Sequence, residues 1–446
     1  MTKNKKLDII LVIILLSYFM ILLDNSIIFT GTIKISQNLN LNEVQLSWIT
    51  NAYALTFGGF LLFGGKAGDI WGRKLIFQIG LIIFGIGSLL VGVSNSGTFI
   101  ILSRAFQGIG SAFLAPASLA LLMDNYTGNA RTKAISYYGA TAGIGSSVGL
   151  IIGGFFASLL SWRYGFLINV PISIVMLILS QKYLSKSTTK RGKIDYIGTI
   201  ASLIGMISLV YSIDGNNYRL ISLIIAIISI TFFIYQEYKV KYPIMPLSLF
   251  KNGERLGGYI GRFLYLGAMI SFWFLTPQIM QTELHFTPLM AGFGFFPLTI
   301  VNFFVAINVS KLSKHFSNSF ILSIGILITL IGMIFITLFS VNLGYWIGIA
   351  IPMILLGIGQ GLSFSTLTVA GIAHANDKDS GAASGIVNTA QQIGGSVGLS
   401  AVISISSLFT NHIYNIEMVI TSIFLFISLL IAIFLIYPSE RKYKTN

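Results

Sequence analysis

A single carboxylate, Asp24, lies inside the first long apolar run of the chain, residues 8–31. Hydrocarbon strongly disfavours an ionised carboxylate unless the group faces a protein interior or a water-filled path. An acid at such a position is therefore expected to titrate or to meet a cation. The alternative interpretation is a structural acid that only accepts hydrogen bonds.

Arg104, in the apolar run 98–122, is the candidate partner of Asp24. Arg104 lies about six residues and Asp24 about seven to nine residues inside the outer ends of their helices, so both are roughly 10 Å below the outer surface. This similar depth makes an ion pair or a water-bridged pair feasible, and the positive charge would favour the ionised carboxylate. The alternative is an arginine that snorkels to the membrane surface.

Composition indicates the kind of protein that must position these two groups. Hydrophobic residues make up 54% of the 446 residues, charged residues 9%, and the mean hydropathy is +0.83. A soluble domain carries about 25% charged residues. The repeated apolar stretches have the length of about 20 residues that a membrane-spanning helix needs, whereas a β-barrel would show alternating segments of about ten. We therefore expect an all-α polytopic membrane protein.

An even number of spans and the distribution of basic residues predict the orientation. With a cytoplasmic N-terminus, only Lys34, Arg163 and Arg219 fall in outer segments, so the positive-inside rule places both termini in the cytoplasm. Basic loops beside anionic lipid also account for the net charge of +14 without nucleic acid. The fourteen predicted spans are 8–31, 45–65, 75–94, 98–122, 133–159, 163–184, 195–214, 218–237, 256–281, 287–309, 319–340, 344–369, 381–408 and 414–437.

Two long connections, 185–194 and 238–255, divide the chain. They bracket two extra helices, which leaves six spans before them and six after them, as in transporters built from two halves around a midplane site. The predicted parts are an N-terminal six-helix bundle, a linker that contains the two extra helices, and a C-terminal six-helix bundle. Their boundaries are 1–184, 185–255 and 256–446.

Several enzyme and cofactor classes lack their usual residues. The chain has no cysteine, its four histidines have no metal-ligand spacing, and no GxxxxGK[ST] phosphate loop occurs. The spans contain no HExxH motif, paired acids or Ser/His/Asp set. We therefore expect no cofactor, no metal and no enzymatic activity, and an energy source in an ion gradient or in the substrate's own gradient.

The loop 65–74 carries the most specific motif. Its glycines permit a tight turn and close helix approach, and its charged residues can hold the loop at the inner face. The glycines are Gly65, Gly68 and Gly72, and the charged residues are Asp69, Arg73 and Lys74. The pattern strongly resembles the signature loop of the major facilitator superfamily. The alternative is an ordinary basic loop.

Two helix motifs extend the resemblance. Residues 101–110 resemble the fourth-helix motif of the superfamily, with Arg104, Gln107, Gly108 and Gly110 matching. Residues 145–154 resemble the antiporter motif of proton-driven exporters; the matching residues are Gly145, Gly149, Gly153 and Gly154. Leu150 replaces the proline of that motif, so a bend at this point is not implied. Glycines at this spacing also serve helix packing alone.

Further segments are similar to the fourteen-helix drug:proton antiporter family, namely 162–172, 241–252 and 380–401. The sequence LLDNSII around Asp24 resembles the pattern of that family, with Ser26 for threonine and with Phe29 and Ile33 for its later asparagine and proline. The resemblance covers essentially the whole chain. It implies the major facilitator fold, in which spans 1, 4, 9 and 12 line a central cavity.

The resemblance also implies roles for individual residues. It makes Asp24 and Arg104 the proton-coupling pair, and it makes the charged residues of 65–74 an inner gate. Some relatives carry a second acid in the thirteenth span, where this chain has the neutral residues Asn388, Gln391 and Gln392. We therefore expect one coupling carboxylate in each transport cycle.

The candidate cavity residues are mostly aromatic or amide side chains. Aromatic faces attract lipophilic cations and stack on planar drugs, although each aromatic can equally be a packing residue. Arg262, an additional intramembrane charge, either snorkels inward or faces the cavity. The candidates are Asn25, Tyr53, Phe57, Phe60, Gln107, Arg262, Trp273, Gln278, Phe296, Gln360, Phe364 and Asn388.

The function implied is proton-coupled multidrug efflux across a bacterial cytoplasmic membrane by alternating access. The expected partners are protons, lipophilic and often cationic drugs or dyes, and membrane lipids, with a monomer as the functional unit. One alternative is an exporter of a single endogenous metabolite, lipid or siderophore. Another is a non-transporting membrane sensor or scaffold, against which the lack of a soluble domain argues.

Overall fold

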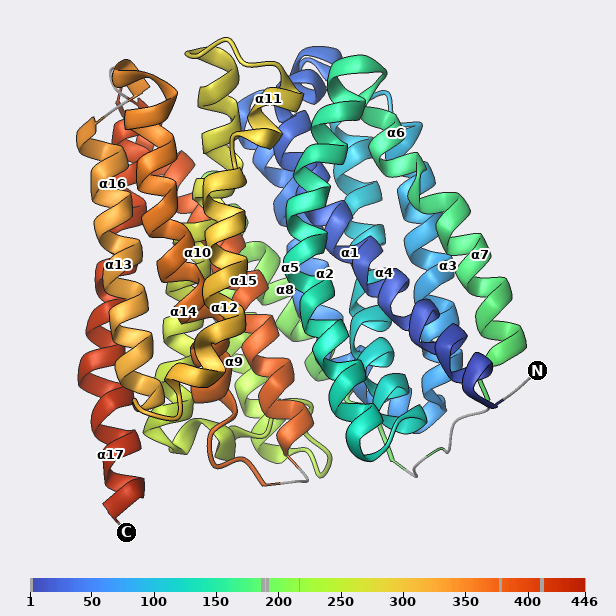
Figure 1. Cartoon of the computed structure of the whole chain (residues 1–446). Helices are drawn as coiled ribbons and strands as arrows, with labels where there is room; N and C mark the ends of the chain where they lie inside the picture. Colours follow the sequence, from blue (N-terminus) through green and yellow to red (C-terminus); the bar gives the residue numbers. More distant parts are fainter. Residues whose placement is uncertain are drawn as a thin grey trace. The chain divides into compact units, whose positions relative to one another are not determined.

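The computed structural model describes residues 3–185, 189, 192–215, 217–339, 341–376, 379–409 and 413–445. Half of the predicted connection 185–194, namely 186–188, 190 and 191, therefore lies outside the described residues. Within the described ranges, every regular element is helical (Figure 1). The prediction of an all-α polytopic fold is confirmed.

The long helices follow the predicted spans closely along the chain. Short helices of other types extend or link them: the 3₁₀ helices η1 (Leu247–Lys251) and η2 (Val341–Leu343), and the π-helices η3 (Trp346–Ala350) and η4 (Ala432–Ile436). The α-helices are α1 (Lys3–Leu39), α2 (Glu43–Trp71), α3 (Arg73–Gly92), α4 (Gly97–Asn125), α5 (Gly128–Leu159), α6 (Trp162–Leu167), α7 (Asn169–Tyr183), α8 (Tyr196–Asp214), α9 (Arg219–Lys239), α10 (Gly253–Thr282), α11 (Pro288–Phe293), α12 (Phe296–Leu312), α13 (Asn318–Phe339), α14 (Ile351–Ile372), α15 (Ser380–Ser406), α16 (Ile413–Ile431) and α17 (Tyr437–Thr445).

Twelve helical segments in the described part of the chain are long and apolar enough to cross a membrane. Helix α15, 27 residues long and rich in glycine and serine, is not among the twelve, and the described part of α5 contributes the shorter apolar segment Ser147–Leu159. The count of fourteen spans therefore stays a prediction. Two predicted spans are interrupted: 163–184 consists of α6 and α7, and 287–309 consists of α11 and α12.

Local sequence explains where several helices begin. Asn42 caps α2 because its side-chain oxygen accepts from the amide N–H of Gln45 at 2.8 Å, and the Gln45 side chain accepts from the Asn42 N–H at 3.2 Å. Ser96 caps α4 in a similar way through the N–H of Phe99. Between α2 and α3 the chain turns through Gly72 alone, whose φ of +104° is a conformation that side chains rarely adopt.

The chain forms two compact units. Unit 1 comprises Met1–Leu203, Val240–Ile244 and Thr287–Gly292, and unit 2 comprises Ile204–Lys239, Met245–Phe286 and Phe293–Asn446. Within unit 1, α4 packs against α2 and α3, while α1 packs against α5. Within unit 2, α14 packs against α12 and α13, and α10 packs against α15 and α16. The predicted three-part division at 184 and 255 stays a prediction.

Candidate functional site

The structure brings Asp24 of α1 and Arg104 of α4 into direct contact inside unit 1. An oxygen of the Asp24 carboxylate and a terminal nitrogen of Arg104 are 2.5 Å apart, and both side chains are fully buried. Arg104 therefore does not snorkel to the surface. A buried pair of this kind is costly to desolvate, and removing one partner leaves an uncompensated charge. Its role in proton coupling stays a prediction.

Two amide side chains complete the surroundings of the carboxylate. The predicted residue Gln107 donates to Asp24 at 2.8 Å and to the Ser88 hydroxyl at 2.7 Å, and it accepts from Arg104 at 2.6 Å. Asn169, the first residue of α7, donates to the same Asp24 oxygen at 3.0 Å. The ionised carboxylate thus accepts from three donors on two other helices, which is the arrangement that satisfies a buried charge.

Aromatic rings enclose the cation. The guanidinium carbon of Arg104 lies 4.1 Å from the centre of the Tyr53 ring and 5.5 Å from the centre of the Phe166 ring. The Tyr53 hydroxyl is 2.6 Å from the Ser111 hydroxyl and accepts from the Asn25 amide at 3.4 Å. In this structure the predicted cavity residues Asn25 and Tyr53 therefore support the ion pair, and Tyr53 is itself buried.

The antiporter-motif glycines position α1, the helix that carries Asp24. A Cβ added to Gly149 would lie 2.7 Å from the Cβ of Ser26, and one added to Gly153 would lie 2.7 Å from the Cα of Ile27. Gly145 approaches Leu22 in the same way. The three glycines thus bring α5 against α1 on both sides of Asp24. A side chain at Gly145, Gly149 or Gly153 would therefore force a shift between α5 and the part of α1 that carries Asp24.

Gly154, the fourth glycine of the motif, faces a different partner within unit 1. A Cβ at Gly154 would lie 2.8 Å from the Cα of Leu289 in the segment 287–292. The Leu289 N–H also donates to the Ser158 hydroxyl at 2.9 Å. Helix α5 therefore contacts α1 with one face and a segment from much later in the chain with another.

The segment 65–74, predicted as a loop, is helical except at Gly72: Asp69 lies at the end of α2, and Arg73 and Lys74 begin α3. These charged residues connect neighbouring helices at one end of unit 1. Arg73 pairs with Asp69 at 2.9 Å and also contacts Asp124 at the end of α4. Lys74 donates to the carbonyls of Gln181 and Leu184, at 3.0 and 2.7 Å. The loop is thus held to α4 and to the end of α7.

Lys66 belongs to the same segment, within α2, and was not among the predicted gate residues. Its ammonium group donates to the carbonyls of Tyr242 and Pro243, both at 2.8 Å. These carbonyls belong to the segment Val240–Ile244, which packs with unit 1 although it follows α9. The position of Lys66 beside the glycines could be read from the sequence, but no sequence pattern predicted its contact with residues about 176 positions later.

We expect Asp69→Ala to reduce turnover several-fold while drug affinity stays nearly unchanged. The substitution removes the ion pair with Arg73 at the end of unit 1, but it leaves the buried cluster around Asp24 intact. Initial efflux rates and equilibrium dye binding, measured on the same reconstituted protein, check this expectation. If binding fell in step with turnover, the loop would not be a gate.

Arg262 of α10 forms a second buried cluster, within unit 2. Its guanidinium donates to the Phe364 carbonyl at 2.8 Å and to the Gln391 side chain at 2.6 Å, and its carbon lies 3.7 Å from the centre of the Phe364 ring. Arg262 is buried, so it does not snorkel, whereas Phe364 is 41% exposed. That Arg262 faces a substrate cavity stays a prediction.

The other cavity candidates are spread over both units. Phe57 contacts the Tyr53 ring and Phe60 contacts Phe63, both edge-on. Gln278 and Asn388 donate to carbonyls of their own helices, and Gln360 is buried. Trp273 contacts Phe295, and Phe296 contacts Phe293, again edge-on.

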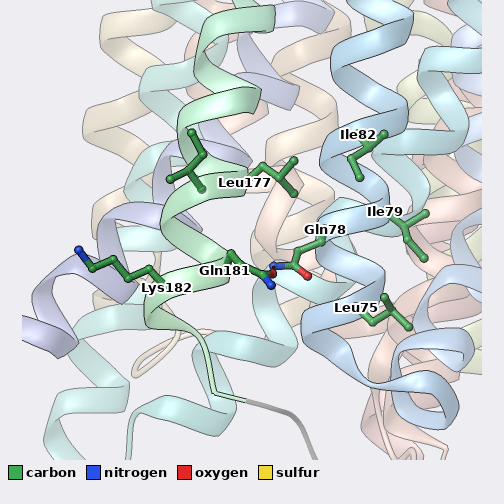
Figure 2. Close-up of a pocket in the computed structure, with 8 residues that line it drawn as sticks. Leu75, Gln78, Ile79, Ile82, Leu177, Gln181 and Lys182 are labelled. Carbon is green, nitrogen blue, oxygen red and sulfur yellow. Dashed lines mark hydrogen bonds between the residues drawn. The ribbon is translucent and has the colours of Figure 1, made fainter.

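A groove of about 530 Å³ lies between α3 and α7, and none of these candidates lines it. Figure 2 shows Gln78 and Gln181 meeting across it, and the two side chains share a hydrogen bond of 2.8 Å. Its other walls are largely aliphatic, with Leu75, Ile79, Ile82, Leu177 and Ile178. The groove therefore does not correspond to the predicted substrate cavity.

Sequence comparison agrees with these features. The profile described as Major Facilitator Superfamily matches residues 14–399. The cephamycin export protein CmcT of Amycolatopsis lactamdurans is 30% identical over 90% of this chain and 85% of that protein. The multidrug transporter protein MdtP of Bacillus subtilis (strain 168) is 28% identical over 89% of this chain and 75% of that protein.

Solved structures show the same fold. The inward-facing, unoccupied structure of a bacterial homolog to the human lysosomal transporter Spinster has a TM-score of 0.71 at 14% identity, and the match covers 100% of this chain and 99% of that chain. At this identity the likeness concerns the fold alone. Because the family profile spans most of the sequence, the chain belongs to the major facilitator superfamily.

Proposed function

We propose that the protein is a proton-coupled exporter of several lipophilic drugs, a drug:H⁺ antiporter of the bacterial cytoplasmic membrane. As a major facilitator it is a multi-pass membrane transporter and not an enzyme. The observation that carries the proton coupling is the fully buried pair of Asp24 and Arg104. We further propose that it functions as a monomer with both termini in the cytoplasm, because the basic loop residues favour that orientation.

The names of the relatives support export of drugs. One relative is named for cephamycin export and another as a multidrug transporter. Both alignments extend over most of this chain, and the family profile, which matches residues 14–399, includes the helices that carry Asp24, Arg104 and Arg262. We propose in addition that this protein exports more than one drug.

Protonation of Asp24 would change the charge balance of its cluster. The neutral carboxyl group no longer compensates Arg104, whose remaining acceptors are the Gln107 oxygen at 2.6 Å and the Ile49 carbonyl at 3.2 Å. The contacts that stabilise the cluster when Asp24 is ionised therefore stabilise it less when Asp24 is protonated. Under alternating access, a proton from outside would bind Asp24 and release drug, and loss of the proton inside would reset the cycle.

Substrates in this proposal are planar, lipophilic and often cationic, such as ethidium-like or acridine-like dyes and fluoroquinolones. Flat aromatic side chains can stack on such molecules. Phe364 and Phe296 are exposed aromatics in unit 2, and Trp273 is half-buried. Phe364 already stacks on Arg262 with one face.

We expect Phe364→Ala, Phe296→Ala and Trp273→Ala to change the drug spectrum unevenly. Different planar drugs stack on different rings, so each variant should lose some substrates by about tenfold and keep others, as burial of one aromatic contributes about 1.5–3 kcal/mol. Efflux of a panel of dyes and antibiotics, measured for each variant at matched expression, provides the test. An equal loss for every substrate would instead indicate a folding or gating defect.

The direct test of the function is dye efflux from cells that express the protein, with and without an uncoupler. We expect efflux above background that the uncoupler collapses. Efflux that survives the uncoupler would exclude proton coupling. If no compound of a broad panel were transported in the presence of a proton gradient, the protein would be better described as an exporter of one endogenous metabolite, and metabolite profiling of a deletion strain would identify it.

A further inference from the structure

Asn169 has an unused acceptor beside the buried carboxylate. Its side chain is fully buried, and its amide nitrogen donates to Asp24 at 3.0 Å. Its amide oxygen has no hydrogen-bond partner among the described residues. A side-chain amide carries both a donor and an acceptor, and buried acceptors are normally satisfied. An unsatisfied oxygen next to a titratable group therefore needs an explanation.

The two protonation states of Asp24 need different partners. The ionised carboxylate accepts hydrogen bonds, and Arg104, Gln107 and Asn169 supply the donors. The protonated carboxyl group must itself donate, and Arg104 has no acceptor. The Gln107 oxygen already accepts from Arg104 at 2.6 Å, whereas the Asn169 oxygen accepts no hydrogen bond among the described residues.

We propose that Asn169 is the hydrogen-bond partner of Asp24 in both protonation states. Its amide nitrogen donates to the carboxylate, and a half-turn of the amide group about the Cβ–Cγ bond lets its oxygen accept from the protonated acid. The amide is nearly the same shape after this half-turn, so the surrounding packing need not change. Asn169 is thus a positioning residue for the proton, and this inference rests on the proposed proton coupling.

Asn169 lies at the junction of α6 and α7, so its change of hydrogen bond with Asp24 takes place at that junction. Asn169 begins α7, and Phe166 in α6 lies three residues earlier, with Ile168 between the two helices. Phe166 lies against the guanidinium of Arg104, so the junction contacts both members of the ion pair. A change in the charge of Asp24 or of Arg104 therefore alters a contact made at the junction of α6 and α7.

The other groups around the carboxylate do not offer the same exchange. Among the described residues, Arg104 from α4 is the charged group that contacts Asp24, and Tyr53 from α2 is a titratable group that contacts Arg104. Ser88 of α3 is reached only through Gln107. Helix α5 contributes glycines on this side, of which Gly149 lies against Leu23 and Ser26.

Infrared difference spectroscopy on the reconstituted full-length protein tests the proposal without depending on transport. Spectra recorded at low and high pH contain the C=O stretch of each protonated carboxyl group, and the Asp24 band is the one that Asp24→Asn removes. We expect this band to move to higher wavenumber in Asn169→Leu, because the acid loses its acceptor. We also expect the pH midpoint of the band to change, which a merely structural role would not produce.

Two further variants make the result decisive. Asn169→Ala serves if the leucine variant does not fold, and Ser173→Ala, one turn further along α7, is the matched control. Ser173 contacts the Met20 sulfur at 3.4 Å and not the carboxylate, so its variant should leave the Asp24 band in place. A band that stays unmoved in both Asn169 variants would overturn the role of Asn169. If Asp24→Asn removed no band at any pH, the proposed proton coupling itself would fail.

Discussion

Asp24→Asn should abolish proton-driven efflux while the protein stays folded in the membrane. Asparagine has nearly the shape of aspartate, and its oxygen can still accept from Gln107 or Asn169, which now donate to the carboxylate. It cannot bind or release a proton, however, and it leaves Arg104 without a compensating charge. Efflux of ethidium from proteoliposomes with an imposed pH gradient should therefore fall to background.

The control for this prediction is a second buried aspartate. Asp214, at the end of α8, accepts from the Ser400 hydroxyl at 2.5 Å within unit 2. Asp214→Asn should retain efflux that depends on the pH gradient.

Asp24→Glu should keep part of the activity, with a changed pH optimum, because the titratable group survives at a displaced position. Full gradient-driven efflux by Asp24→Asn would exclude Asp24 as the coupling residue.

The fold was predictable because membrane-spanning helices leave a strong signal in composition. Runs of about 20 apolar residues specify helices in lipid, where every backbone group must be satisfied internally. Interruptions were harder to predict. The break at Ile168 between α6 and α7 lies inside the predicted span 163–184, whose average hydropathy indicates one helix where the structure has two.

The charged centre of the site was predictable for the same physical reason. An acid and an arginine at similar depth in apolar helices have few ways to be accommodated, and mutual contact is one of them. Arg104 and Asp24 do meet in the structure. Arg262 left two alternatives open in the sequence, and its bonds to Phe364 and Gln391 show that it does not snorkel.

The neutral partners of the charges could not be predicted. Asn169 is a single polar residue at a helix junction, and its contact with Asp24 joins residues 145 positions apart. Tyr53 is an aromatic residue that sequence reasoning assigned to the substrate, yet its ring lies on Arg104 and its hydroxyl contacts Ser111. Hydrophobic periodicity reports which face of a helix is buried, but not which buried side chain meets which.

The second large effect is expected for Arg104→Ala. Removing one partner of a buried ion pair commonly costs about 3–5 kcal/mol, because the other charge is left uncompensated. The variant can avoid this penalty only by keeping Asp24 protonated. We therefore expect the optimum of efflux to move to higher pH, with a lower maximal rate, because the proton must still leave Asp24 in each cycle.

Two comparisons separate the charge of Arg104 from its volume. Arg104→Met keeps an unbranched chain between Tyr53 and Phe166, so any effect that it shares with Arg104→Ala comes from the lost charge. Adding Asp24→Asn to either variant should recover thermal stability, because no uncompensated carboxylate remains, but it should not recover efflux. An unchanged pH profile with full activity in Arg104→Ala would mean that the two residues, although 2.5 Å apart, do not act together in transport.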